Sequence, residues 1–163
     1  MSEAGANATI YVEVAHRARQ ATMATLQPLI GEFNVTEWSK RAFDAIWNSP
    51  TFPWDRIGRN HRDPDRLEIA IWVGRRLVGM ALALSNGDEV ILEFLEGDPA
   101  TDCPLKGFRT LIALDVAANY AQARGKHRLL VQPMNSGLRN HYTKLGFSPF
   151  PPSTGSPYLW KKV

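Results

Sequence analysis

The sequence contains little cysteine and no long apolar run. Cys103 is the one cysteine among 163 residues, which excludes an internal disulfide and a cysteine-based zinc site. A small packed residue explains Cys103 better than a nucleophile does. None of the four histidines has metal-ligand spacing to another ligand, so we expect no structural metal. No apolar run reaches the roughly 20 residues that span a bilayer, and the N-terminus does not read as a signal peptide. We therefore expect a cytoplasmic protein that does not use a membrane.

Three motifs of common enzyme classes are also missing. The chain has no G-x-x-x-x-G-K-[ST] phosphate loop, no G-x-G-x-x-G dinucleotide motif and no G-x-S-x-G nucleophile elbow. These absences argue against a Walker-type nucleotide hydrolase, a dinucleotide enzyme and a serine hydrolase. A formal net charge of +3 permits an anionic cofactor or an RNA partner but requires neither.

The length and composition are those of an ordinary globular domain. Hydrophobic residues make up 44% of the chain and charged residues 21%. A length of 163 residues suits one compact domain with one core. We find no internal repeat and no low-complexity tract. We therefore predict that residues 1–163 form a single domain.

The first third of the chain predicts one strand, two helices and a loop. Ile10–Val14 alternates and is rich in β-branched residues, which favours a strand. Residues 16–30 are loosely helical, and Gly31 is expected to end that helix. Thr36 is expected to cap a second helix. The segment Asn48–Arg66 has three prolines and is expected to be a loop. The buried stripe predicted for the second helix consists of Trp38, Phe43, Ile46 and Trp47.

The middle of the chain predicts an antiparallel three-stranded meander. Its strands are expected at Leu67–Val73, Leu77–Ser85 and Glu89–Glu96. Asn86-Gly87-Asp88 has the composition of a tight hairpin turn between the second and third of them.

The last third predicts a helix, a strand, a short helix and a final strand. The first helix is expected from about 107 to 124, and the strand at His127–Pro133. The short helix covers 136–145 and ends at Gly146, and Pro157–Val163 is the final strand, with room for one short strand before it. A strand, a crossover helix and a second strand form a parallel unit. We therefore predict an α/β (α+β) fold: a mixed, mostly antiparallel sheet with helices on its faces.

The start of the helix near residue 107 is a candidate anion site. The first turn of a helix has free backbone N–H groups and a positive dipole end, and a glycine there lets a ligand approach the backbone. Gly107 occupies that place, and Lys106 and Arg109 add two cations. Taken alone, an ordinary helix start with two solvated cations explains these residues better.

A second sequence pattern is similar to that of a known protein family. Asn135, Tyr142, Gly146 and Phe147 follow the strand at His127–Pro133 with fixed spacing. This pattern and the order of elements from Leu67 onward resemble the GNAT superfamily of acyl-CoA-dependent N-acyltransferases. The family's phosphate-binding pattern, Gln/Arg-x-x-Gly-x-Gly/Ala, is matched here only at its middle glycine. Pro104 and Arg109 stand at its first and last positions.

The resemblance implies a GNAT-like sheet and acetyl-CoA as cofactor. It implies that the backbone amides of residues 106–110 hold the pyrophosphate, with Arg109 pairing directly with a phosphate. It also implies that the pantetheine arm runs along the end of the third meander strand. Asn135 would cap the short helix and help to hold the cofactor. The cofactor-binding residues implied in this way are Leu95, Gly97, Lys106, Gly107, Phe108, Arg109, Thr110 and Asn135.

Two residues are candidates for the chemistry itself. By the resemblance, Tyr142 lies near the thioester sulfur. A phenol with a pKa near 10 is protonated at neutral pH and can donate its proton to a departing thiolate, which phenylalanine cannot do. Glu93 is the preferred general base, because it alternates with apolar strand residues and is expected to be partly buried, although an ordinary solvent-facing glutamate explains it equally well. Glu96 is the alternative, and His141 ranks lower.

The predicted faces of that strand follow from simple alternation. Ile91, Glu93 and Leu95 would share one face of the sheet. The other face would carry Val90, Leu92, Phe94 and Glu96.

Several functions remain open at this point. The first is an acetyl-CoA-dependent N-acetyltransferase that acts on a primary amine of a small molecule or a protein. The second is a toxin-like acetyltransferase acting on aminoacyl-tRNA. The third is a catalytically silent GNAT-like binding or inhibitory module, and the fourth an unrelated α/β ligand-binding domain. A homodimer is compatible with all of them. The cations that would face an RNA are Arg56, Arg59, Arg62, Arg124, Lys126 and Arg128.

The sequence does not decide what role four of the tryptophans have. They suit an apolar acceptor pocket and a hydrophobic core equally well. Those concerned are Trp38, Trp47, Trp54 and Trp72.

Overall fold

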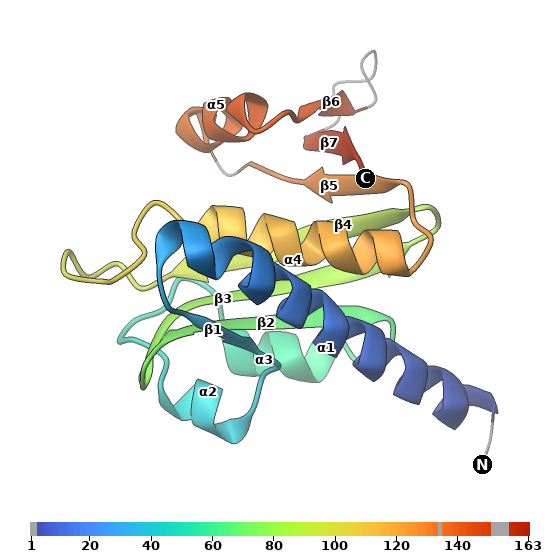
Figure 1. Ribbon diagram of the computed structural model, residues 1–163, viewed down its shortest axis with the longest axis horizontal. Helices are drawn as coiled ribbons and strands as arrows, with labels where there is room; N and C mark the ends of the chain where they lie inside the picture. The colour runs from blue at the N-terminus through green and yellow to red at the C-terminus, as the bar shows by residue number, and fades with distance from the viewer. Residues whose placement is uncertain (1–2, 134, 151–156) are drawn as a thin grey trace.

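A seven-stranded sheet organises the residues that the structure describes, which are 3–133, 135–150 and 157–163 (Figure 1). The structure is a computed structural model. The strand order is β1-β2-β3-β4-β5-β7-β6. The strands are β1 Asn34–Thr36, β2 Arg66–Val73, β3 Arg76–Asn86, β4 Glu89–Gly97, β5 Arg128–Val131, β6 Ser148–Phe150 and β7 Tyr158–Lys162. The helices are α1 Glu3–Ile30, α2 Lys40–Asp44, α3 Trp54–Asn60, α4 Arg109–Ala123 and α5 Ser136–Lys144.

The sheet is mixed and mostly antiparallel, as predicted. β1 to β4 pair antiparallel in sequence order, and Gly87, with φ of 59°, makes the turn between β3 and β4. β4 and β5 are parallel, and α4 is the crossover between them. β7 pairs antiparallel with both β5 and β6. The predicted meander, crossover unit, short helix and last strand are confirmed within a few residues of their expected ends.

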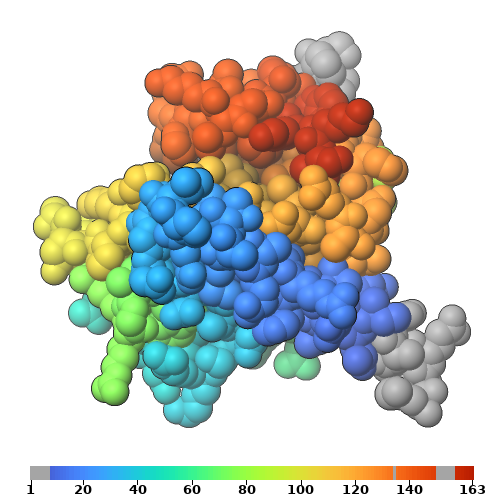
Figure 2. Space-filling model, in the orientation of Figure 1, coloured from blue at the N-terminus to red at the C-terminus, as the bar shows by residue number. Residues whose placement is uncertain are grey.

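Helices cover both faces of the sheet. α1 and α4 pack together on one face and bury the larger core, in which both helices contribute mainly small or branched residues (Figure 1). On the other face, α2 and α3 close a second core around Trp38, Trp54 and Trp72. These three tryptophans are at most 9% exposed, so they belong to the core. Figure 2 shows α1 running across the front of the molecule, with residues from 135 onward gathered above it.

The first predicted strand is wrong. Ile10–Val14 lies inside α1, which continues without interruption for 28 residues. Its alternating residues do not form a buried strand face, because the side chains of Ile10 and Val12 are 53% and 68% exposed. Five alternating residues are outweighed by the alanine-rich helical sequence around them and by packing of α1 on α4. Gly31, with φ of 102°, ends this helix as predicted.

The predicted cap at Thr36 is also wrong. Thr36 ends β1, and its hydroxyl is engaged with Trp72 Nε1 at 2.9 Å and with a backbone carbonyl. The cap of α2 is Ser39, whose Oγ accepts from the N–H of Ala42 at 3.2 Å. Of the stripe predicted for this helix, Phe43 alone lies within α2. The expected loop after it contains α3.

A β-bulge at Glu93 changes the faces of β4. Leu82 is opposite Phe94 and Ala83 is opposite Leu92, so Glu93 is an extra residue in its strand. Leu92 packs in the core under α1 and α4, whereas Phe94 packs on the core under α2 and α3. The prediction that these two residues share a face is therefore wrong.

No helix in the described ranges, α1 included, combines the length and the apolarity needed to cross a membrane.

Candidate active site

The candidate site lies where β4 and β5 separate. Their parallel pairing runs from Glu89–Arg128 to Leu92–Val131. Beyond this pairing, β4 continues to Gly97, while the segment after β5 turns through Pro133 towards α5. The separation leaves a cavity of about 420 Å³. β4 forms one wall, the first residues of α4 form its end, and α5 with the segment before it forms the second wall.

The structure brings six of the predicted site residues to this cavity. The lining residues among the predictions are Glu93, Leu95, Gly97, Arg109, Thr110 and Tyr142. The other predicted residues are not among those that line it. Lys106, Gly107 and Phe108 lie exposed in the loop before α4, and Asn135 lies exposed at the start of α5.

Tyr142 is held by the local structure of α5. Asn135 caps the helix, its Oδ1 accepting from the N–H of Leu138 at 2.8 Å. Gly146, with φ of 97°, turns the chain so that the N–H of Phe147 bonds to the carbonyl of Tyr142 at 3.1 Å. The two rings meet edge to face at 5.9 Å. Tyr142 is 5% exposed, and this burial raises the pKa of its phenol above the ordinary value.

Glu93 reaches the cavity because of the bulge. An extra residue in a strand redirects its side chain and leaves its backbone outside the regular ladder. Its side chain is half-buried. Burial, together with the negative charges of Glu93 and Glu89, raises the pKa of the Tyr158 phenol on β7.

Arg109 is occupied by backbone carbonyls. Its Nη1 donates to the carbonyls of Val78 at 3.1 Å and Asp98 at 2.7 Å, and lies 3.5 Å from Cys103 Sγ. The guanidinium also covers Gly97, where an added Cβ would lie 2.3 Å from Arg109 Cζ. A phosphate would have to compete with these bonds for the side chain.

The loop before α4 is fixed at its base and open at its tip. The carboxylate of Asp98 accepts from the N–H of Ala100 at 3.0 Å and from Arg76 Nη2 at 3.1 Å, and these bonds lower its pKa despite its burial. At the tip, Leu105 and Gly107 have φ of 62° and 95°. Phe108 stands at the N-cap position of α4, and its side chain makes no capping hydrogen bond to the N–H groups of the first turn.

Sequence reasoning did not foresee the role of Glu96. Its carboxylate accepts from Trp47 Nε1 (3.0 Å), Trp54 Nε1 (3.0 Å), the N–H of Thr51 (2.8 Å) and the N–H of Phe52 (3.0 Å). These donors lie more than 40 residues away in sequence, so no local pattern points to them. Because its acceptor sites are filled, Glu96 is a poorer candidate for the general base than Glu93.

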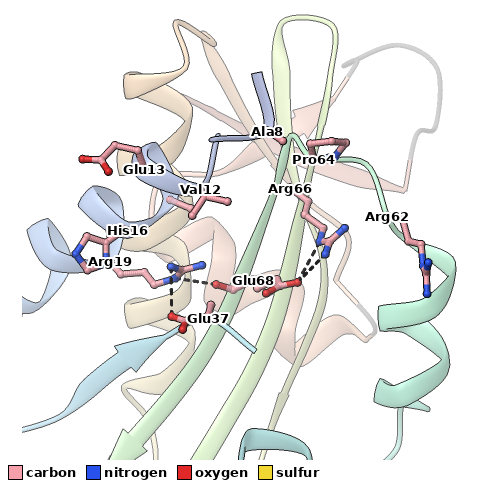
Figure 3. A pocket seen from close by; sticks show the side chains of 11 residues that line it. Ala8, Val12, Glu13, His16, Arg19, Glu37, Arg62, Pro64, Arg66 and Glu68 are labelled. Carbon is pink, nitrogen blue, oxygen red and sulfur yellow. Dashed lines mark hydrogen bonds and ion pairs between the residues drawn. The ribbon is translucent and has the colours of Figure 1, made fainter. Parts of the chain in front are cut away.

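A second cavity, of about 570 Å³, lies between α1 and β2 (Figure 3). It shares no lining residue with the first. Arg19 is 6% exposed there, and its Nε donates to the carbonyl of Glu68 at 3.0 Å. Its Nη1 lies 3.9 Å from Glu37, and Arg66 pairs with Glu68 at 3.0 Å. The charges in this cavity therefore largely neutralise one another.

Several of the cations proposed to face RNA are engaged with the protein itself. Arg124 forms a bidentate pair with Asp65, and Arg128 lies 3.3 Å from Glu89. Arg59 is 3.5 Å from Asp55, and Lys126 donates to the carbonyl of Gly87. Among the described residues, no group of three or more His, Cys, Asp or Glu is arranged to hold a metal ion.

Solved structures of other proteins are similar to this one in fold. The sequence matches no protein-family model and no curated protein. The structure of Ard1 from Thermoplasma volcanium is similar with a TM-score of 0.61 at 14% identity, over 80% of this chain and 97% of that one. The ribosomal-protein-S18-alanine N-acetyltransferase from Escherichia coli is similar with a TM-score of 0.61 at 16% identity, over 81% and 94%.

A third structure agrees with these two. A Bacillus subtilis acetyltransferase, solved in complex with CoA, has a TM-score of 0.56 at 14% identity, over 81% of this chain and 98% of that one. At such low identity the similarity concerns the fold. The chain therefore has the fold of the GNAT acetyltransferases, as the sequence pattern around Tyr142 predicts.

Proposed function

We propose that the protein is an acetyl-CoA-dependent N-acetyltransferase that acetylates a primary amine, with residues 1–163 acting as one domain. The observation that carries the proposal is the meeting of Tyr142 and Glu93 at one cavity. Tyr142 comes from α5 and Glu93 from the bulge of β4. These two elements are separated in the sequence by α4 and β5. A potential acid and a potential base on different walls of one cavity suit a reaction that needs both.

The cofactor end of the cavity fits a phosphate-bearing thioester. The first turn of α4 offers N–H groups and the positive end of the helix dipole. Gly107 lies where the loop is open, since an added Cβ there would meet no atom within 4 Å. From Glu93 to Gly97, the edge of β4 that faces away from β3 is unpaired by β5 and can accept an extended chain. CoA and acetyl-CoA are bound in two structurally similar proteins, the Bacillus subtilis acetyltransferase and the toxin AtaT.

The residues present can perform the proton transfers. Bound at this end, acetyl-CoA would supply the acetyl thioester. Glu93 would accept one proton from the ammonium of the acceptor, which frees the nitrogen lone pair to form the new C–N bond as the C–S bond breaks. Tyr142 would donate its phenol proton to the departing sulfur. The second proton that the nitrogen loses would restore the phenol through solvent, and Glu93 would release its proton to solvent.

Arg109 gives a specific reason to keep a second candidate. Because its guanidinium is held by two carbonyls, it is less available to a phosphate than the sequence suggests. This observation favours a silent binding module with the same fold. The two candidates differ in whether acetyl-CoA binds.

Calorimetric titration with acetyl-CoA tests the proposal. We expect the unmodified protein to bind and Gly107→Glu to lose at least tenfold in affinity, because the new carboxylate repels the pyrophosphate. The matched control is Gly125→Glu. Gly125 also has a positive φ, 70°, and also has no atom within 4 Å of an added Cβ, but it lies at the other end of α4. Failure of the unmodified protein to bind would favour the silent module.

A further inference from the structure

The cavity continues past the edge of β4 to the second face of the sheet. Leu95 packs with the core under α1 and α4, where the cofactor end lies. Phe94 packs with the core under α2 and α3, and Phe52 joins it from the segment before α3. Both phenylalanines line the cavity. The cavity thus has a second end, formed by two aromatic rings, on the side of the sheet opposite α4.

The position of Phe52 is set by Glu96. The carboxylate accepts through both oxygens from two consecutive backbone N–H groups, those of Thr51 and Phe52, and from the indoles of Trp47 and Trp54. Four charge-assisted bonds fill the acceptor capacity of one carboxylate. They fasten the segment 47–54 to the end of β4.

The ring of Phe52 rests on other fixed rings. It meets Phe94 edge to face at 5.5 Å and Trp54 at 5.7 Å. Trp54 is 1% exposed and contacts Trp38 at 5.5 Å. Such edge-to-face contacts hold rings in defined orientations. Phe52 and Phe94 themselves are half-buried, so each keeps part of its surface towards the cavity.

The charge next to these rings is negative. Among the described residues that line the cavity, Glu93 is the only acidic one and Arg109 the only basic one. Arg109 is bonded to carbonyls at the α4 end. Glu93 and Phe94 both line the cavity. An ammonium near Glu93 would therefore have aromatic surface beside it, which stabilises both a cation and an apolar substituent.

We propose that the acceptor is a small primary amine carrying an aromatic group, which packs on Phe52 and Phe94 with its nitrogen at Glu93, and that Glu96 is a positioning residue that holds Phe52 there. The inference rests on the proposed acetyl transfer, whose acceptor it specifies. Glu96 acts through Phe52 and takes no proton.

Steady-state acetylation of 2-phenylethylamine and ethylamine tests the acceptor class. Burying the phenyl ring should lower KM for 2-phenylethylamine about 10- to 100-fold relative to ethylamine. Phe52→Ala should remove most of that difference, and Phe52→Leu, which keeps apolar volume, should remove less. Equal KM values for the two amines would overturn the inference.

The role of Glu96 is tested by Glu96→Gln. The new NH2 group would face N–H donors, so half of the bonds would be lost. We expect about a tenfold rise in KM for 2-phenylethylamine, with kcat changed less than about threefold. Glu89→Gln, at the far end of β4 and outside the cavity, is the control. A fall in kcat at unchanged KM would instead identify Glu96 as the base and overturn the positioning role.

Calorimetry separates failure of this inference from failure of the proposed function. Acetyl-CoA, 2-phenylethylamine and ethylamine are each titrated into the unmodified protein, the amines with and without CoA. Binding of acetyl-CoA with no preference among the amines would overturn the acceptor class alone. Absence of acetyl-CoA binding would overturn the acetyl transfer. In that case 2-phenylethylamine that still binds tightly, and loses affinity in Phe52→Ala, would support the aromatic site itself.

Discussion

Under the proposed function, Tyr142 has a reason to be a phenol at a position where leucine would pack equally well. Its ring packs against Phe147, and the residue lines the cavity. Burial raises the pKa of the phenol, so the group remains protonated throughout the neutral range. A protonated phenol carries the proton that a departing thiolate needs, but it cannot serve as the base.

The first prediction concerns this hydroxyl. Tyr142→Phe keeps the ring contacts and removes the proton, so we expect kcat to fall about 100- to 10,000-fold. The affinity for acetyl-CoA in calorimetry should change less than about twofold, since ring packing is conserved. Tyr11→Phe, on α1 and outside the cavity, is the matched control and should leave kcat unchanged. An unchanged kcat in Tyr142→Phe would remove this residue from the reaction.

At the scale of elements, one carboxylate ties the segment before β2 to α4. Asp65 lies in the segment between α3 and β2, and it accepts from Arg124 at 3.0 and 2.8 Å and from the hydroxyl of Tyr120 on α4. Burial acts to raise the pKa of Asp65, but these hydrogen bonds outweigh it and the pKa is lowered. The hydrogen bond and burial raise the pKa of Tyr120 in turn. The segment is thereby tied to the crossover helix.

The second prediction concerns this tie. Asp65→Asn should lower the free energy of unfolding by about 2 kcal/mol at pH 7. The folded pKa of Asp65 is below the unfolded value of about 3.9, so its charge stabilises the fold above that pH. The contribution is lost as the pH falls through the folded pKa. Urea unfolding at pH 7 and pH 3 should therefore show a difference from the unmodified protein that shrinks at pH 3. Asp55→Asn, in an exposed pair, is the control.

The elements differ in how far the sequence predicts them. β2 to β4, α4 and α5 follow from alternation and from glycines such as Gly146, because those signals are local. The start of α1 is not predictable from Ile10–Val14, because packing on α4 decides it. The bulge at Glu93 depends on the register with β3, and the donors to Glu96 come from a distant segment. The sequence therefore predicts six residues that line the cavity, but neither the faces of β4 nor the contribution of Phe52.

At the scale of the whole molecule, the sheet consists of two parts with a short junction. β1 to β4 form a continuous antiparallel unit, in which β3 and β4 pair over eight residue positions. The C-terminal part, with β5, α5, β6 and β7, joins β4 through four positions and packs on the crossover helix. In Figure 1 this part lies above α4.

The third prediction is that the two parts have different local stability. Amide hydrogen exchange of the native protein should be at least tenfold faster in α5, β6 and β7 than in β2 and β3, because few strand pairs hold the C-terminal part to the sheet. Mass spectrometry of peptides from each part measures this difference. Equal protection of both parts would mean that the junction unfolds only with the whole sheet.

The short pairing of β4 with β5 has a consequence for heat inactivation. The proposed base, Glu93, belongs to the larger part, and the proposed acid, Tyr142, to the smaller one. An opening of the smaller part would disperse the two groups while the core around Trp54, to which that part contributes no residue, stays intact. Catalysis would then end at a lower temperature than the one at which the main sheet melts, and it would return on cooling without a complete refolding of the chain.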